Sequence, residues 1–127
     1  PGRLAGPLAR VRGLGSAKEG VQHWWAPRVT AVALIPLTLW FIYSAVTLTG
    51  ADQATVRDWL HRPVDAILMA LLIIAMFHHL ALGLQVVIED YVHREGVKLA
   101  AILLVKGLIV LVAIAALFTV LRIAFGG

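Results

Sequence analysis

The sequence contains no cysteine, and only 14% of its residues are charged. Without thiols the chain can form neither disulfides nor thiolate metal sites, and it cannot ligate an iron–sulfur cluster. It also has no glycine-rich phosphate-binding loop and no nucleophile motif. Any chemistry that it supports therefore depends on histidine, carboxylate or tyrosine side chains, or on a bound cofactor.

Hydrophobic residues are abundant instead. They make up 61% of the 127 residues, and the mean hydropathy is +0.90. Soluble globular domains average about 45–50% apolar residues. The composition therefore predicts an all-α integral membrane protein with one small membrane domain.

Three stretches are long and apolar enough to cross a bilayer, which takes about 20 helical residues. They cover about residues 28–49, 63–88 and 97–124. Pro36 lies inside the first stretch and is expected to kink it, which membrane helices tolerate. Residues 50–62 mix polar and apolar side chains, as is typical of a short amphipathic helix on the membrane surface.

The N-terminal region is predicted to divide into two parts. Residues 1–15 are rich in glycine and arginine without periodicity, and we expect a basic extended arm. The Ser16-Ala17-Lys18-Glu19 segment has the pattern of a capping box at a helix start. A short interfacial helix from there to Trp24 or Trp25 suits the headgroup level, where tryptophan is enriched. The membrane-anchor domain is then residues 16–127.

Basic residues are concentrated before the first span, which is typical of a cytoplasmic segment. They are Arg3, Arg10, Arg12, Lys18 and Arg28. A nucleic-acid-binding arm is the other interpretation, but no globular, aromatic-interleaved surface follows it. We therefore predict a cytoplasmic N-terminus and no nucleic-acid partner. Three spans then place residues 50–62 and the C-terminus outside.

A histidine pair, His78 and His79, lies inside the second span. An ionisable residue within a bilayer span is costly and is a candidate functional residue, and imidazole is a standard axial ligand of haem iron. Neighbouring side chains on a helix diverge by about 100°, so both cannot ligate one metal. Gly83, one turn after His79, leaves room for a flat macrocycle, whereas Leu82 fills that place for His78. His79 is the better ligand candidate; the alternative is a histidine hydrogen-bonded to a neighbouring helix.

Asp90 and Tyr91 end the same helix, roughly 17–18 Å beyond His79 along its axis. A tyrosine hydroxyl at the cytoplasmic interface can donate to a quinone carbonyl, and an adjacent aspartate can orient that hydroxyl or relay protons. The alternative is an interfacial aromatic residue beside a solvated carboxylate.

Arg28 opens the first span on the predicted cytoplasmic side. Its guanidinium can pair with haem propionates, or it can act only as a positive-inside anchor. For His23, a role at the haem and a role only at the membrane interface likewise both remain possible. Lys106 in the third span is expected to snorkel to the inner interface.

Together these residues resemble the hydrophobic membrane-anchor subunit of succinate dehydrogenase (succinate:quinone oxidoreductase, respiratory Complex II), over about residues 20–124. The resemblance rests on His23 and Arg28-Val29-Thr30-Ala31 at the head of the first span, and on His79-x3-Gly83 and Asp90-Tyr91 in the second. The sister membrane chain, the cytochrome b subunit, has a Gly-x-Arg-His-type segment after its ligand histidine. This chain has Gly83-Leu84-Gln85-Val86 there.

The resemblance implies a multi-pass protein of the bacterial inner membrane that helps bind haem b. His79 would be one of two axial ligands of the haem iron, and the cytochrome b subunit would supply the other. Arg28 would lie near the propionates, with His23 and Gly83 as further cofactor-binding residues.

The resemblance also implies a ubiquinone site, in which Tyr91 hydrogen-bonds the quinone and Asp90 supports it. The flavoprotein subunit oxidises succinate, and the iron–sulfur subunit passes the electrons to the quinone. The anchor would dock both of these partners to the membrane and would have no catalytic activity alone. A fumarate reductase anchor and a purely structural, haem-free anchor remain alternatives. A histidine-based metal transporter fits less well, because the first and third spans contain no histidine or acidic residue.

The predicted topology can be tested with a reporter fused after Gly127 that is active only outside the cytoplasm. Three spans and a cytoplasmic N-terminus predict strong activity from this fusion. Activity of a cytoplasm-specific reporter at the same position would contradict the topology.

Overall fold

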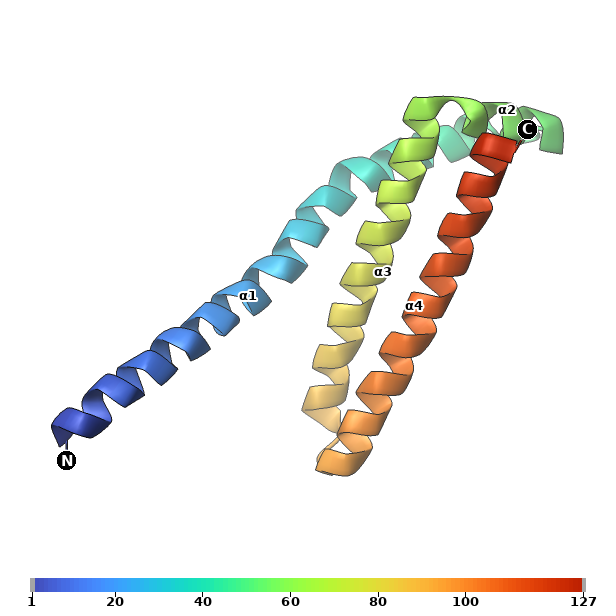
Figure 1. Ribbon diagram of the computed structural model, residues 1–127. Coiled ribbons are helices and arrows are strands. Elements are labelled where there is room, and N and C mark those ends of the chain that lie inside the picture. The colour runs from blue at the N-terminus through green and yellow to red at the C-terminus, as the bar shows by residue number, and fades with distance from the viewer. Residues whose placement is uncertain (1, 127) are drawn as a thin grey trace.

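The computed structural model describes the backbone of residues 2–126 and the side chains of residues 24–126. The described residues form four helices and no strand (Figure 1). The helices are α1 (Gly2–Thr47), α2 (Gln53–His61), α3 (Pro63–Tyr91) and α4 (Glu95–Gly126). The predicted all-α fold is confirmed.

Three helical segments are long and apolar enough to cross a bilayer, as predicted. They are Trp24–Thr47, Pro63–Tyr91 and Glu95–Gly126, with 24, 29 and 32 residues. At about 1.5 Å per residue each exceeds the roughly 30 Å thickness of a bilayer's hydrocarbon core. The short helix expected between the first two spans is α2.

The N-terminal region differs from the prediction. α1 is helical from Gly2, so the arm that we expected to be extended is helical instead, and no separate helix begins at Ser16. Leucine, alanine and arginine, which are strong helix formers, are interspersed among the glycines of this segment. The backbone also stays helical through Pro27 and Pro36. Composition did not predict that residues 2–15 are helical, because the many glycines outweighed the helix propensity of the residues between them.

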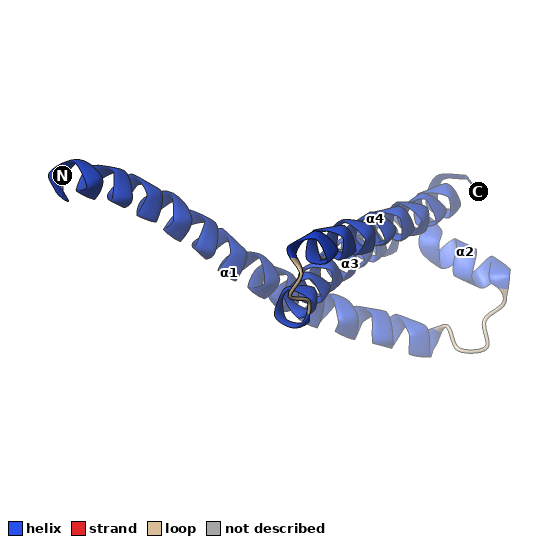
Figure 2. Cartoon of the chain, turned by 90° about the horizontal axis from the view of Figure 1, so that it is seen from below, coloured by secondary structure: helices blue, strands red, loops and turns tan. Residues whose placement is uncertain are grey.

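α3 is the central helix of the bundle. It packs against α1 on one side and against the antiparallel α4 on the other. α1 diverges from α3 and α4 toward its N-terminus, and α2 lies across the opposite end of the bundle (Figures 1 and 2). The two ends of the chain lie at opposite ends of the bundle, as three spans require (Figure 1).

The hydrophobic core is small and lies under α2. Trp59 and Leu60 of α2 pack with Ile73 of α3 and Val120 of α4. Trp40 of α1 stacks on Trp59, with ring centroids 5.6 Å apart. By contrast, the apolar windows of the three spans are only 11%, 11% and 0% buried. Lipid or helices of other chains must therefore cover most of their apolar surface.

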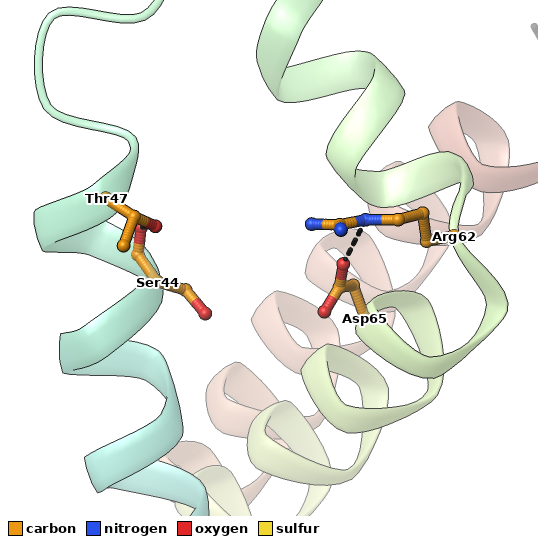
Figure 3. A network of polar contacts seen from close by, with 4 residues as sticks. All are labelled: Ser44, Thr47, Arg62 and Asp65. Carbon is orange, nitrogen blue, oxygen red and sulfur yellow. Dashed lines mark hydrogen bonds and ion pairs between the residues drawn. The ribbon is translucent and has the colours of Figure 1, made fainter.

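Two buried polar residues lie near the same end. Ser44 of α1 and Asp65 of α3 are 4% and 9% exposed, and their side chains point toward one another (Figure 3). Asp65 forms an ion pair with Arg62, whose Nε lies 2.8 Å from Asp65 Oδ2. An acidic residue in the first turn of α3 also interacts favourably with the helix dipole. The ion pair and the helix dipole therefore offset the cost of burying the Asp65 carboxylate.

The turn between α1 and α2 is fixed by one glycine and one cap. Gly50 has a φ of +79°, a left-handed conformation that favours glycine. Asp52 then caps α2 and accepts from the Thr55 amide at 2.9 Å and the Thr55 hydroxyl at 2.7 Å. The hydroxyl bond, and then the amide bond, lower the pKa of the Asp52 carboxyl below its usual value.

Replacing Asp52 should loosen α2. The bonds from Thr55 favour the ionised carboxyl, so the cap is fully formed above the unfolded pKa of about 3.9 and is lost as the pH falls through the lower folded pKa. Asp52→Ala should therefore speed hydrogen exchange of the α2 amides at neutral pH, and this difference should shrink below about pH 4. Asp58→Ala, an exposed change in the same helix, is the control. Equal exchange in Asp52→Ala and the unmodified protein at neutral pH would contradict the capping role.

Candidate functional site

The candidate site is built around His79 in the middle of α3. Its side chain is half-buried, and Nδ1 lies 3.0 Å from Oγ1 of Thr30 in α1. Thr30 Oγ1 also lies 3.0 Å from the carbonyl oxygens of Ala26 and Pro27. Among the described side chains, the Thr30–His79 contact is the only hydrogen bond that joins two spans. It fixes the orientation of the imidazole ring.

His79 faces a cavity of about 140 Å³ between α1 and α3. A Cβ added at Gly83 would meet nothing within 4 Å, so the cavity is open beside this glycine. Gln85 Oε1 is buried in the wall without a hydrogen-bond partner, which leaves an unsatisfied acceptor. The lining residues are Pro27 of α1 and His79, Leu82, Gly83, Gln85, Val86 and Glu89 of α3.

The two histidines of the pair lie in different surroundings. His78 is exposed, whereas His79 is half-buried against α1. This agrees with the predicted divergence of their side chains. Leu82, which we expected to fill the space one turn beyond His78, also lines the cavity of His79. The difference between the two histidines comes from the packing of α1 on only one face of α3.

Asp90 and Tyr91 end α3 at the end of the bundle away from α2. Both side chains are exposed, and that of Tyr91 is 79% exposed. The structure keeps them away from His79, in agreement with their predicted separation along the helix. Their polar groups are instead accessible to a ligand or to another chain.

Arg28 lies one helical turn after Trp24 on α1. Its guanidinium stacks over the Trp24 ring at 4.0 Å, and Nη1 donates to the Trp24 carbonyl at 3.0 Å. It does not line the His79 cavity. The side chain of His23 lies outside the described side chains. Lys106 is half-buried in α4.

Sequence reasoning missed Thr30, Gln85 and Glu89 as site residues. Thr30 was part of the motif at the head of the first span, but its partner His79 lies 49 residues away. Nothing in a single sequence pairs two such positions. Gln85 did carry a signal, because an amide in an apolar span needs a hydrogen-bond partner.

The comparisons with known proteins agree on one family. Residues 3–121 match the succinate dehydrogenase/fumarate reductase transmembrane subunit family. The hydrophobic membrane anchor subunit of succinate dehydrogenase from Paracoccus denitrificans is 38% identical over 101 residues, covering 80% of this chain and 78% of the relative.

Two further relatives carry similar names. The succinate dehydrogenase hydrophobic membrane anchor subunit from Rickettsia bellii is 33% identical, covering 78% of this chain and 79% of that relative. The succinate dehydrogenase membrane anchor subunit of Reclinomonas americana is 30% identical, covering 70% and 77%. No solved structure gives a significant match. The chain therefore belongs to the succinate dehydrogenase/fumarate reductase transmembrane subunit family, as a hydrophobic membrane-anchor subunit.

Proposed function

We propose that this chain is the haem- and quinone-binding anchor of a succinate:quinone oxidoreductase of four subunits in a bacterial inner membrane. The observation that carries the proposal is His79, an oriented imidazole in mid-span that faces an open cavity. The partners are the cytochrome b subunit, the iron–sulfur subunit and the flavoprotein. The names of the relatives favour succinate oxidation over fumarate reduction.

The residues around His79 fit one side of a haem b. The chain offers a single imidazole there, and among the described residues no three histidine or acidic side chains gather as a metal site. A second axial ligand must then come from another chain, as a haem shared with the cytochrome b subunit requires. Gly83 leaves space beside the ring. Bound haem would act as a one-electron carrier.

Arg28 is the proposed partner of a haem propionate at the head of the first span. Within the described residues its guanidinium has an indole face and one carbonyl as partners, and no carboxylate. Arg28 and Thr30 lie about 200° apart around α1, so the Arg28 side chain leaves the helix on a different face from the Thr30–His79 contact. A propionate would therefore have to extend beyond the His79 cavity to reach it.

Tyr91 and Asp90 are the proposed quinone contacts. Their exposed side chains lie at the end of the α3 span. The Tyr91 hydroxyl would donate to a quinone carbonyl and draw electron density onto the oxygen as electrons arrive from the iron–sulfur subunit. The Asp90 carboxylate would hand on protons from the cytoplasmic water. Quinol formation consumes both electrons and protons, so a site at this interface suits it.

A haem-free structural anchor is the second candidate, and the Thr30–His79 bond favours it too. Polar side chains often join membrane helices through such bonds, and this one joins α1 to α3. The two candidates differ in whether His79 Nε2 binds iron, which the following variants test.

His79→Leu should abolish the low-spin haem spectrum of the purified complex, because it removes an axial ligand. His78→Leu is the matched control: it makes the same change one residue away on an exposed face, and it should leave haem content and spectrum unchanged. An unaltered spectrum in His79→Leu would support the structural anchor instead. Loss of haem in His78→Leu alone would reverse the assignment.

Tyr91→Phe should lower succinate:quinone activity by about 10²–10³-fold, the usual cost of losing one positioned hydrogen-bond donor. Succinate oxidation with an artificial acceptor upstream of the quinone should persist, and so should haem content. Tyr43→Phe, which removes the hydroxyl of the other tyrosine, 70% exposed on α1, is the control. Quinone reduction at the unmodified rate in Tyr91→Phe would show that Tyr91 is only an interfacial residue.

A further inference from the structure

Three hydrogen-bonding atoms lie 3.0 Å from the hydroxyl oxygen of Thr30. The carbonyl oxygens of Ala26 and Pro27, on the preceding turn, each lie 3.0 Å from Oγ1, and His79 Nδ1 lies 3.0 Å away on α3. A threonine hydroxyl in a helix commonly donates to the carbonyls three and four residues earlier. With its proton directed at these carbonyls, the oxygen can only accept from His79.

We infer that Thr30 is a positioning residue that sets the tautomer of His79, with Nδ1–H donating to Thr30 Oγ1 and the lone pair left on Nε2. This inference rests on the proposed haem function and specifies how the protein prepares the ligand. An imidazole binds iron through an unprotonated nitrogen. Thr30 therefore determines which nitrogen of His79 is available to the metal.

Counting hydrogen bonds favours this tautomer over its alternative. In the inferred arrangement Thr30 donates to its own helix and His79 donates to Thr30, which makes two bonds. In the other arrangement Thr30 donates its proton to Nδ1 of His79. The Ala26 and Pro27 carbonyls then receive no hydrogen bond from Thr30, and the Nε2–H of His79 points into the cavity without an acceptor. An N–H without an acceptor in a span is costly because hydrocarbon cannot accept a hydrogen bond from it.

The same bond should tune the ligand as well as orient it. Donation from Nδ1–H to an oxygen makes the imidazole a stronger electron donor through Nε2. A stronger donor stabilises ferric over ferrous haem and lowers the reduction potential. Because Oγ1 is held by α1 and the ring by α3, this effect depends on the contact between the two helices.

Thr30→Val tests the inference in the fully assembled enzyme, because valine keeps the side-chain shape and removes the hydroxyl. Haem affinity should fall by about 10–100-fold, as is typical when a ligand histidine loses its outer partner. The haem that remains should have a more positive midpoint potential and altered electron paramagnetic resonance g values. Thr30→Ser keeps the hydroxyl and should restore all three.

Thr119→Val is the matched control. Its hydroxyl also donates to the carbonyl four residues earlier, Ala115, at 2.8 Å, but none of the described histidines forms a hydrogen bond with it. It should leave haem content, potential and g values unchanged. If Thr30→Val does not assemble, Thr30→Cys replaces it, since a thiol is of similar size and a weak acceptor. The potential should then lie above those of the unmodified and Thr30→Ser complexes.

The outcomes separate this inference from the proposed function. Absence of haem from the unmodified complex, or a low-spin spectrum that survives His79→Leu, would overturn the haem function itself. If His79→Leu removes the haem but Thr30→Val leaves occupancy, potential and g values unaltered, only the role of Thr30 is wrong. Reduced occupancy with unaltered potential and g values would show that Thr30 merely ties α1 to α3, and would also overturn the inference.

Discussion

Hydrocarbon offers no hydrogen-bond partner to a polar group, and the polar features of this chain follow from that constraint. The backbone satisfies itself within three long helices. Inside these spans, Thr119 donates back to its own helix, whereas His79 finds its partner Thr30 on a different one. A mid-span histidine without a partner would be costly, so the bond that stabilises it also fixes the direction of its second nitrogen. If His79 binds haem as proposed, the bond that satisfies the histidine is also the bond that prepares it as a ligand.

The uneven packing of the bundle has a functional consequence. The buried cluster of Trp59, Leu60, Ile73 and Val120 lies at the α2 end, while α1 diverges from α3 toward the other end, where Asp90 and Tyr91 lie (Figure 1). The spans leave most of their apolar surface uncovered. A cofactor shared between two chains needs such an open face, because each chain can enclose only part of it. The end of the bundle that contains Asp90 and Tyr91 has few buried residues, and it is therefore the end best suited to receive partner subunits.

Periodicity and hydropathy were sufficient to predict the three spans, α2 and the divergence of His78 from His79, because each follows from helix geometry within a short segment. Three features could not be read in this way. The helical N-terminal segment was obscured by its glycines. That Leu82 also lines the cavity of His79 depended on which face of α3 receives α1. The Thr30–His79 bond joins residues 49 positions apart, and one sequence carries no signal of which distant residues meet.

On the proposed assignment, the haem and quinone sites lie at different depths along α3. His79 precedes Tyr91 by 12 residues, or about 18 Å of helix, in a hydrocarbon core of about 30 Å. Quinone reduction consumes protons, which water supplies only at the interface, and the α3 span ends at Tyr91. A haem exchanges electrons alone and can remain in hydrocarbon. One helix can thus carry both sites because their needs for water differ.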